Sequence, residues 1–142
     1  MTRRIKQEDT TGCGLACIAM LSGKKYKVVR KKAVDLGIQQ ENKRTFYTSA
    51  NELKKLGEQF GVSIKNSRKN PWEEYGFPWK DWVHLPNKAI IAINYNKKKK
   101  WHWVLFVREK CSAFVLDPKK KGKNDQRTDW GRMKPKGFLP VE

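Results

Sequence analysis

QEDTTGCGLACIAMLS, residues 7–22, is the stretch of sequence that decides the fold. From Cys13 onward it is rich in Ala and Leu, which favour a helix, and Ser22-Gly23 supplies a stop signal. Thr10 or Thr11 is available to cap the first turn. A thiol that enters a helix directly after a turn meets the positive end of the helix dipole and unpaired backbone N–H groups. Cys13 is therefore the candidate nucleophile.

Two further helices are expected in the first half of the chain. One covers residues 24–36, where apolar residues recur on one face, Lys and Arg fill the other, and Gly37 is placed to end it. The next begins at Ser49, which forms a capping-box pattern with Glu52, and it runs to Gly61.

The second half of the chain is rich in short apolar runs typical of strands. Residues 89–93, 101–107 and 113–116 are separated by connections of hairpin length, so we expect an antiparallel meander. Residues 62–64 and 138–139 are candidates for two more short strands. Because the helices come first and the strands afterwards, the sequence predicts a single α+β domain that spans the whole chain.

Two segments lack a regular apolar pattern. Residues 67–87 contain three Pro and three Trp and are expected to form a long irregular loop. Their indoles are interpreted as core residues, with a substrate groove as the alternative: Trp72, Trp79 and Trp82. Residues 118–136 are polar, basic and rich in Gly and Pro, and are expected to wrap the surface as a loop.

Partners for a thiolate come from two neighbouring strands. The run WHWVLFV at 101–107 holds His102 on a stiff strand, and Asp117 ends the strand that follows. Adjacent antiparallel strands can bring the carboxylate beside the ring, so Asp117 could orient His102 and stabilise its charged form. His102 could then act as a base for Cys13. The other imidazole, His84, lies in the irregular loop and is the less favoured candidate.

Other residues are candidates for contact with a substrate. Gln7 lies six residues before Cys13, and its amide could face a developing oxyanion together with the Cys13 backbone N–H. Gly12 and Gly14 flank the thiol and would let a substrate backbone approach closely. The candidate substrate-binding residues also include the two indoles that flank the candidate base: Trp101 and Trp103.

These motifs together resemble the C39-like branch of the papain-like cysteine peptidases. The resemblance rests on Gln-x5-Cys-Gly-Leu-Ala-Cys-x-Ala-Met, His-Trp-Val and Asp-Pro, which occur in the family's order between Gln7 and Pro118. It implies an α+β papain-like fold, with an N-terminal helical lobe packed on an antiparallel sheet, and a thiol-dependent hydrolase acting on peptide or amide bonds. The roles that it implies are nucleophile for Cys13, general base and acid for His102, orienting carboxylate for Asp117 and oxyanion donor for Gln7.

Two features depart from the pattern of that family. The residue before the cysteine is usually Asp, and here it is Gly12. Members fused to peptide exporters cleave leader peptides after a Gly-Gly site, whereas this sequence carries no transporter part. The substrate is therefore left open between a peptide bond and another amide.

The net charge of +18, from 32 Lys and Arg against 14 Asp and Glu, attracts polyanions. An alternative function is therefore a nucleic-acid-binding or RNA-directed protein, such as a toxin or effector, on a papain-like scaffold. It would bind through Lys97–Lys100 and the basic segment 118–136, where Trp side chains are interleaved with the cations. The charge could instead steer an acidic peptide or protein substrate toward the cleft.

Composition argues against several other classes of protein. The chain has three cysteines, so a disulfide framework is not expected, and Cys17 is interpreted as a core residue and Cys111 as incidental. Two His and no Cys-x-x-Cys pair give no zinc site, and no metal or organic cofactor is expected. The sequence contains no apolar run of about 20 residues and no signal-peptide pattern, so we expect a cytoplasmic protein.

Overall fold

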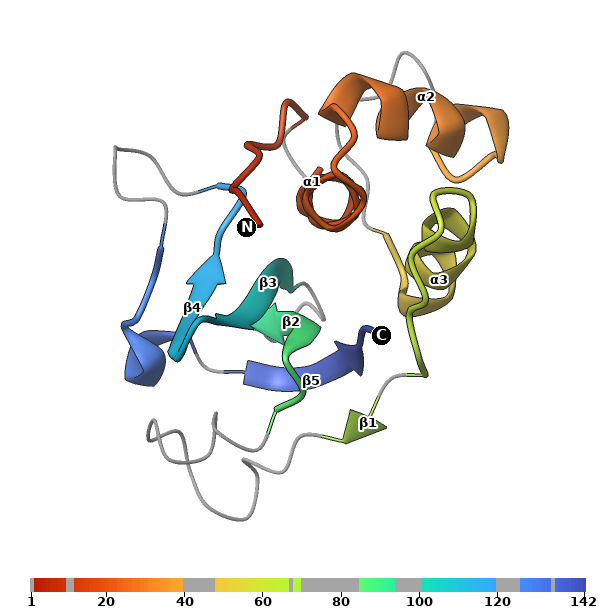
Figure 1. Ribbon diagram of the computed structural model, residues 1–142. Coiled ribbons are helices and arrows are strands. Elements are labelled where there is room, and N and C mark those ends of the chain that lie inside the picture. Colours follow the sequence, from red (N-terminus) through yellow and green to blue (C-terminus); the bar gives the residue numbers. More distant parts are fainter. Residues whose placement is uncertain are drawn as a thin grey trace.

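A layer of helices packs on one face of an antiparallel sheet in the computed structural model (Figure 1). The structure describes residues 2–9, 12–39, 48–66, 68–69, 85–93, 101–119, 126–133 and 135–142. No helix among these residues is long and apolar enough to cross a membrane.

Helix α1 (Cys13–Ser22) is the central helix of the fold. Figure 1 shows it between the sheet and the other two helices, and every residue from Cys13 to Met20 is buried. A helix that is apolar on all sides is stable only when it is enclosed in this way. Gly23, at φ 73°, ends the helix as expected. The expectation of a Thr cap is wrong, because the capping position is Gly12, which has no side chain to accept a hydrogen bond.

Helices α2 (Tyr26–Asp35) and α3 (Ala50–Glu58) cover α1 and match two of the expected segments. The capping box is confirmed: Ser49 Oγ accepts from the Glu52 N–H at 3.2 Å, and Glu52 Oε1 accepts from the Ser49 N–H at 2.9 Å. The expected continuation of α3 toward Gly61 is wrong, because the chain turns after Glu58.

The sheet has the strand order β1-β5-β2-β3-β4. Its strands are β1 (Arg68–Lys69), β2 (Lys88–Ile93), β3 (His102–Glu109), β4 (Ser112–Leu116) and β5 (Pro135–Pro140). The predicted antiparallel meander is confirmed as β2-β3-β4. The last strand is also confirmed and pairs with the other edge of β2. The predicted strand at 62–64 is reduced to one bridge, from Ile64 to Val141.

The register of the β3–β4 hairpin places the end of β4 near the start of β3. Leu105 pairs with Leu116, so the next residue, Asp117, falls opposite Val104. In an antiparallel pair, residues opposite one another share a face of the sheet, as do residues two apart along one strand. Asp117 is therefore a diagonal neighbour of His102, on the same face.

The second face of the sheet carries its own apolar cluster. Its buried members are Leu85, Ala89, Ile91, Ile93, Val104, Phe106, Val115, Met133 and Phe138, and Trp130 packs against them. Trp130 lies in the 3-10 helix η1 (Trp130–Arg132), and β5 begins at Pro135. The description of 118–136 as a surface loop is therefore wrong for its second half, because apolar side chains there bury part of the sheet.

Replacing the α3 cap tests the contribution of the capping box. Ser49→Ala removes the side-chain acceptor for the Glu52 N–H and should lower the free energy of unfolding by about 1 kcal/mol in a denaturant titration. Ser63→Ala, at an exposed position outside any helix, is the matched control and should change it little. Equal losses in the two variants would contradict the assigned role of the cap.

Candidate active site

The Cys13 thiol lies where the first turn of α1 meets the start of β3. Its side chain is buried, with 5% of the residue exposed. The backbone N–H of Trp103 donates to Cys13 Sγ at 3.4 Å. The same hydrogen bond would also stabilise a sulfur anion. Because Trp103 follows His102 directly in β3, this contact brings the thiol to the residue predicted as its base.

The imidazole of His102 joins Cys13 to Asp117. His102 Nε2 lies 2.6 Å from Asp117 Oδ1, and the ring is close enough to the Cys13 side chain for that side chain to raise the pKa of His102. An ionised carboxylate can only accept hydrogen bonds, so Nε2 carries the proton and Nδ1 is left for Cys13. The structure thus brings the three residues together in the order Cys13–His102–Asp117.

The protonated form of His102 is stabilised by its neighbours. Burial disfavours the charged ring, but hydrogen bonds and negative charge from Asp117 and Cys13 outweigh it and raise the pKa of His102 to about 9. At neutral pH the group is therefore an imidazolium that can donate a proton.

The Asp117 carboxylate is buried and accepts three hydrogen bonds. Besides His102, the Lys119 backbone N–H donates to Oδ1 at 2.9 Å and Arg127 Nη1 donates to Oδ2 at 2.7 Å. Burial alone would raise the pKa of Asp117, but His102, Lys119 and Arg127 together hold it well below its usual range. Asp117 is therefore ionised at every pH at which the protein would work.

Arg127 is the site residue that sequence reasoning missed. It lies ten residues beyond Asp117, in the segment expected to be a surface loop that binds polyanions. The pairing that brings it back is a bridge to Val115 in β4. No motif or spacing in the sequence signals this bridge.

Gly12 and Gly14 both face tightly packed parts of the same chain. A Cβ on Gly12 would lie 1.9 Å from the Tyr26 hydroxyl oxygen, and one on Gly14 would lie 3.0 Å from a methyl carbon of Leu53. Packing within the protein therefore requires glycine at position 12, and at position 14 it leaves little room for a larger residue. The expectation that they let a substrate approach stays a prediction.

The Tyr26 hydroxyl that Gly12 accommodates belongs to a buried polar cluster. It donates to Asp9 Oδ2 at 2.6 Å, and Arg30 Nε donates to the same oxygen at 3.0 Å. The Gly12 N–H donates to the Asp9 carbonyl at 3.2 Å. Asp9 thus fixes the turn that leads into Cys13, three residues before the position at which the C39-like pattern has its aspartate.

Gln7 lies beside the end of β4. Its backbone N–H donates to the Pro118 carbonyl at 3.2 Å, and its side-chain Nε2 donates to the Asp9 carbonyl at 3.1 Å. The role of Gln7 as oxyanion donor stays a prediction.

The two indoles beside His102 differ in exposure. Trp103 is 6% exposed, and its Nε1–H donates to the Thr48 carbonyl at 2.8 Å, which places it in the core. This burial argues against the predicted contact between the Trp103 side chain and substrate. Trp101 is half-buried and packs edge-on against Trp103, with ring centroids 5.8 Å apart, so it keeps some surface for a ligand.

The other cysteines do not resemble a second nucleophile. Cys17 is fully buried, and burial, together with the negative charges of Cys13 and Asp117, raises the pKa of its thiol well above the usual value. Cys111 is exposed in the β3–β4 turn. Within the described part of the chain, no group of His, Cys, Asp and Glu could hold a metal ion. Three sets of candidates lie outside the described residues: His84, the Trp residues of segment 67–87, and Lys97–Lys100.

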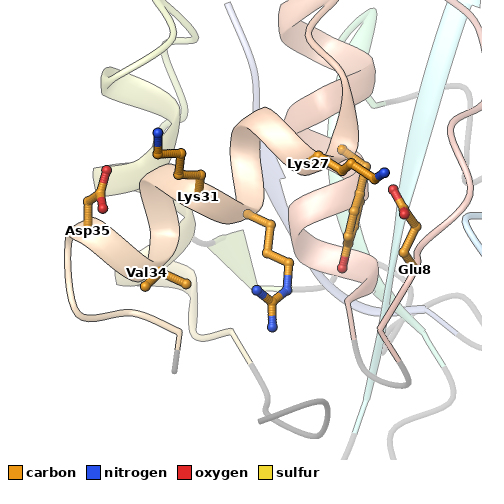
Figure 2. Close-up of a pocket in the computed structure, with 7 residues that line it drawn as sticks. Glu8, Lys27, Lys31, Val34 and Asp35 are labelled. Atoms are coloured by element: carbon orange, nitrogen blue, oxygen red, sulfur yellow. The ribbon is translucent and has the colours of Figure 1, made fainter. Parts of the chain in front are cut away.

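A cavity of about 460 Å³ lies beside the segment that leads into Cys13. Figure 2 shows side chains of α2 on one side of it and Glu8, from the N-terminal segment, on the other. Its lining is mostly charged: Glu8, Tyr26, Lys27, Arg30, Lys31, Val34 and Asp35.

Known proteins resemble this chain in family and in fold. The family model of the Peptidase C39 family matches residues 2–129. No curated protein matches the sequence. A double glycine motif protease from an AMS/PCAT transporter, solved in complex with the leader peptide, has a TM-score of 0.60 and 20% identity, over 97% of this chain and 89% of that one. The peptidase domain of Streptococcus ComA, a bifunctional ABC transporter of a quorum-sensing pathway, has a TM-score of 0.65 and 14% identity, over 99% and 98%. These likenesses confirm the predicted papain-like fold.

Replacing the Asp117 carboxylate tests whether it stabilises the imidazolium. Asp117→Asn removes a negative charge from His102 Nε2, so the pKa of His102 should fall from about 9 by a unit or more, toward the usual value of about 6.5. NMR of the ring resonances can measure this readily, because the chain has 2 His. Glu58→Gln, an exposed carboxylate at the end of α3, is the control. If the pKa of His102 is unchanged in Asp117→Asn, the bond between Asp117 and His102 does not stabilise the imidazolium.

Proposed function

This chain belongs to the Peptidase C39 family and is a cysteine peptidase, and we propose that Cys13, His102 and Asp117 are its catalytic triad. The observation that carries the proposal is that one ring, His102, lies 2.6 Å from the Asp117 carboxylate and close enough to the Cys13 side chain for that side chain to raise its pKa. A nucleophile, a base and an orienting group within hydrogen-bond reach are the requirements for covalent catalysis by a thiol.

The chemistry follows from the arrangement of these three residues. Cys13 gives its thiol proton to His102, its sulfur attacks the scissile carbonyl carbon, and the electron pair of the C=O bond moves to the oxygen. When the tetrahedral intermediate collapses, His102 gives its proton to the leaving amine and a thioester remains on Cys13. His102 then takes a proton from water, which attacks the thioester and releases the acid. Asp117 holds the ring throughout.

Stabilisation of the oxyanion is assigned to the turn before α1. The Cys13 backbone N–H lies at the N-terminus of a helix, where N–H groups and the helix dipole favour negative charge. We assign the second donor to the side-chain amide of Gln7. Its backbone N–H donates to Pro118 and its Nε2 donates to Asp9, and these bonds hold Gln7 beside the segment that leads into Cys13. A preorganised pair of donors is the usual means of stabilising such an intermediate.

Selective labelling of Cys13 tests the triad. In a Cys111→Ser background, iodoacetamide should alkylate Cys13 and leave the buried Cys17 unmodified, as read by peptide mapping. His102→Ala should slow the reaction at least about tenfold, because the thiolate loses the imidazolium that stabilises it. Equal labelling of Cys13 and Cys17, or a rate unaffected by His102→Ala, would sink the proposal.

The substrate that we propose is an acidic peptide cleaved after a double glycine. The similar protease was solved with a leader peptide and is named for a double glycine motif. The net charge of +18 favours an acidic partner. The cavity beside the segment that leads into Cys13 has Lys27 and Lys31 in its wall together with Glu8 and Asp35, and we assign the two lysines to a carboxylate of such a peptide (Figure 2).

Charge reversal in this cavity tests the choice of substrate. With a Gly-Gly peptide that carries Asp and Glu before the cleavage site, Lys27→Glu with Lys31→Glu should raise KM about tenfold and leave kcat unchanged, because the change affects binding only. Lys55→Glu with Lys65→Glu makes the same change in net charge at two positions that do not line the cavity. An equal effect of both pairs would mean that only overall charge matters.

The alternative of nucleic-acid binding gains no support from the described residues. Lys97–Lys100 lie outside them, and Arg127, the first basic residue of segment 118–136 described after Lys119, is bonded to Asp117 and Asp129.

A further inference from the structure

The chain returns to the active site at Arg127. Its backbone pairs with Val115 of β4: the Arg127 N–H donates to the Val115 carbonyl at 2.8 Å, and the Val115 N–H donates to the Arg127 carbonyl at 2.9 Å. This pairing sets the guanidinium behind Asp117, where Nη1 donates to Oδ2 at 2.7 Å. The Arg127 side chain is 14% exposed and that of Asp117 is 7% exposed, so the contact is largely shielded from water.

The opposite edge of the same guanidinium is held by Asp129. Arg127 Nε donates to Asp129 Oδ1 at 2.9 Å, and Nη2 donates to Oδ2 at 2.7 Å. Two parallel bonds to one carboxylate fix the plane of a guanidinium as well as its position. Arg127 therefore cannot turn away from Asp117 without breaking the pair with Asp129.

We propose that Arg127, held by Asp129, is a positioning residue that fixes the Asp117 carboxylate so that Oδ1 faces His102 Nε2. A carboxylate can rotate about its Cβ–Cγ bond, and both of its oxygens accept hydrogen bonds. With Oδ2 bonded to Arg127, the oxygen left for the ring is Oδ1, which the Lys119 N–H also contacts. This inference rests on the proposed roles of His102 and Asp117.

Positioning and simple charge have opposite effects on His102. The groups that face the ring are Cys13 and Asp117, with the neutral Cys17 on the next turn of α1 and Arg127 and Asp129 behind the carboxylate. If Arg127 acted through its charge alone, its removal would favour the imidazolium and raise the pKa of His102. If it positions Asp117, its removal loosens the bond to the ring and lowers that pKa.

The decisive measurement is the NMR titration of His102 in a Cys13→Ala, His84→Gln background, where one ring remains and no thiolate is coupled to it. Arg127→Gln should lower the pKa of His102 by about one unit relative to the same background with Arg127 intact. Arg132→Gln removes an exposed cation from η1 and is the control, which should leave the pKa unchanged. A pKa that rises or stays constant in Arg127→Gln would overturn the proposal.

Asp129→Asn provides a second route, because it leaves Arg127 in place and weakens only its anchor. It should lower the same pKa by a smaller amount. If the pKa of His102 is unchanged in Asp129→Asn, the proposal is contradicted, even if Arg127→Gln fails to fold. With Cys13 restored, alkylation should slow by up to about tenfold in Arg127→Gln, because one pKa unit is a tenfold change in the stability of the imidazolium relative to the neutral ring. If Cys13 is unreactive in the protein with Arg127 intact, while the pKa of His102 still falls in Arg127→Gln, the triad proposal fails and the positioning role stands. If Cys13 is reactive in the protein with Arg127 intact, and the pKa of His102 is unchanged in Arg127→Gln, the triad proposal stands and the positioning role fails.

Discussion

The contact between the first turn of α1 and the start of β3 determines the geometry of the whole site. One hydrogen bond, from the Trp103 N–H to Cys13 Sγ, marks the point where the helical layer meets the sheet. It depends on the burial of α1 along its length, since an enclosed helix has little freedom to slide on the strand beneath it. His102 and the nucleophile therefore meet as a consequence of how the core packs, and the reactive pair needs no separate scaffold.

Two buried carboxylates flank that contact, and each is compensated by a cation and a hydroxyl or ring. Asp9 accepts from Tyr26 and Arg30 beneath the turn that precedes Cys13, and Asp117 accepts from His102 and Arg127 at the end of β4. An isolated buried carboxylate would be strongly destabilising, whereas a fully bonded one fixes its neighbours in place. The first cluster holds the nucleophile's turn and the second holds its base.

The sequence was sufficient to predict the parts of the fold and the site that depend on a local pattern or on two neighbouring strands. Cys13 could be placed from the turn and the helix that follows it, and the proximity of His102 to Asp117 follows from the register of one hairpin. The capping box of α3 is likewise a local signal. These features depend on residues that are close in the chain or joined by a short turn, so spacing alone carries the information.

Features that depend on distant packing could not be predicted. The packing of the Tyr26 hydroxyl against Gly12 is one such feature, because nothing in the sequence places the two residues together. The bond from the Trp103 indole to the Thr48 carbonyl, in the segment that precedes α3, is another, because no local pattern joins these two residues. Arg127 is one cation among many in a basic segment, and only the bridge to β4 distinguishes it.

A double-mutant cycle on the alkylation rate of Cys13 tests most directly whether Cys13, His102 and Asp117 act as one unit. If Asp117 acts on the thiol only through the ring, Asp117→Ala should slow alkylation in the parent protein and have no further effect once His102→Ala is present. Folding of each variant would be verified by its unfolding transition. Independent effects, with the double variant slower than either single one by the product of the two factors, would contradict the account.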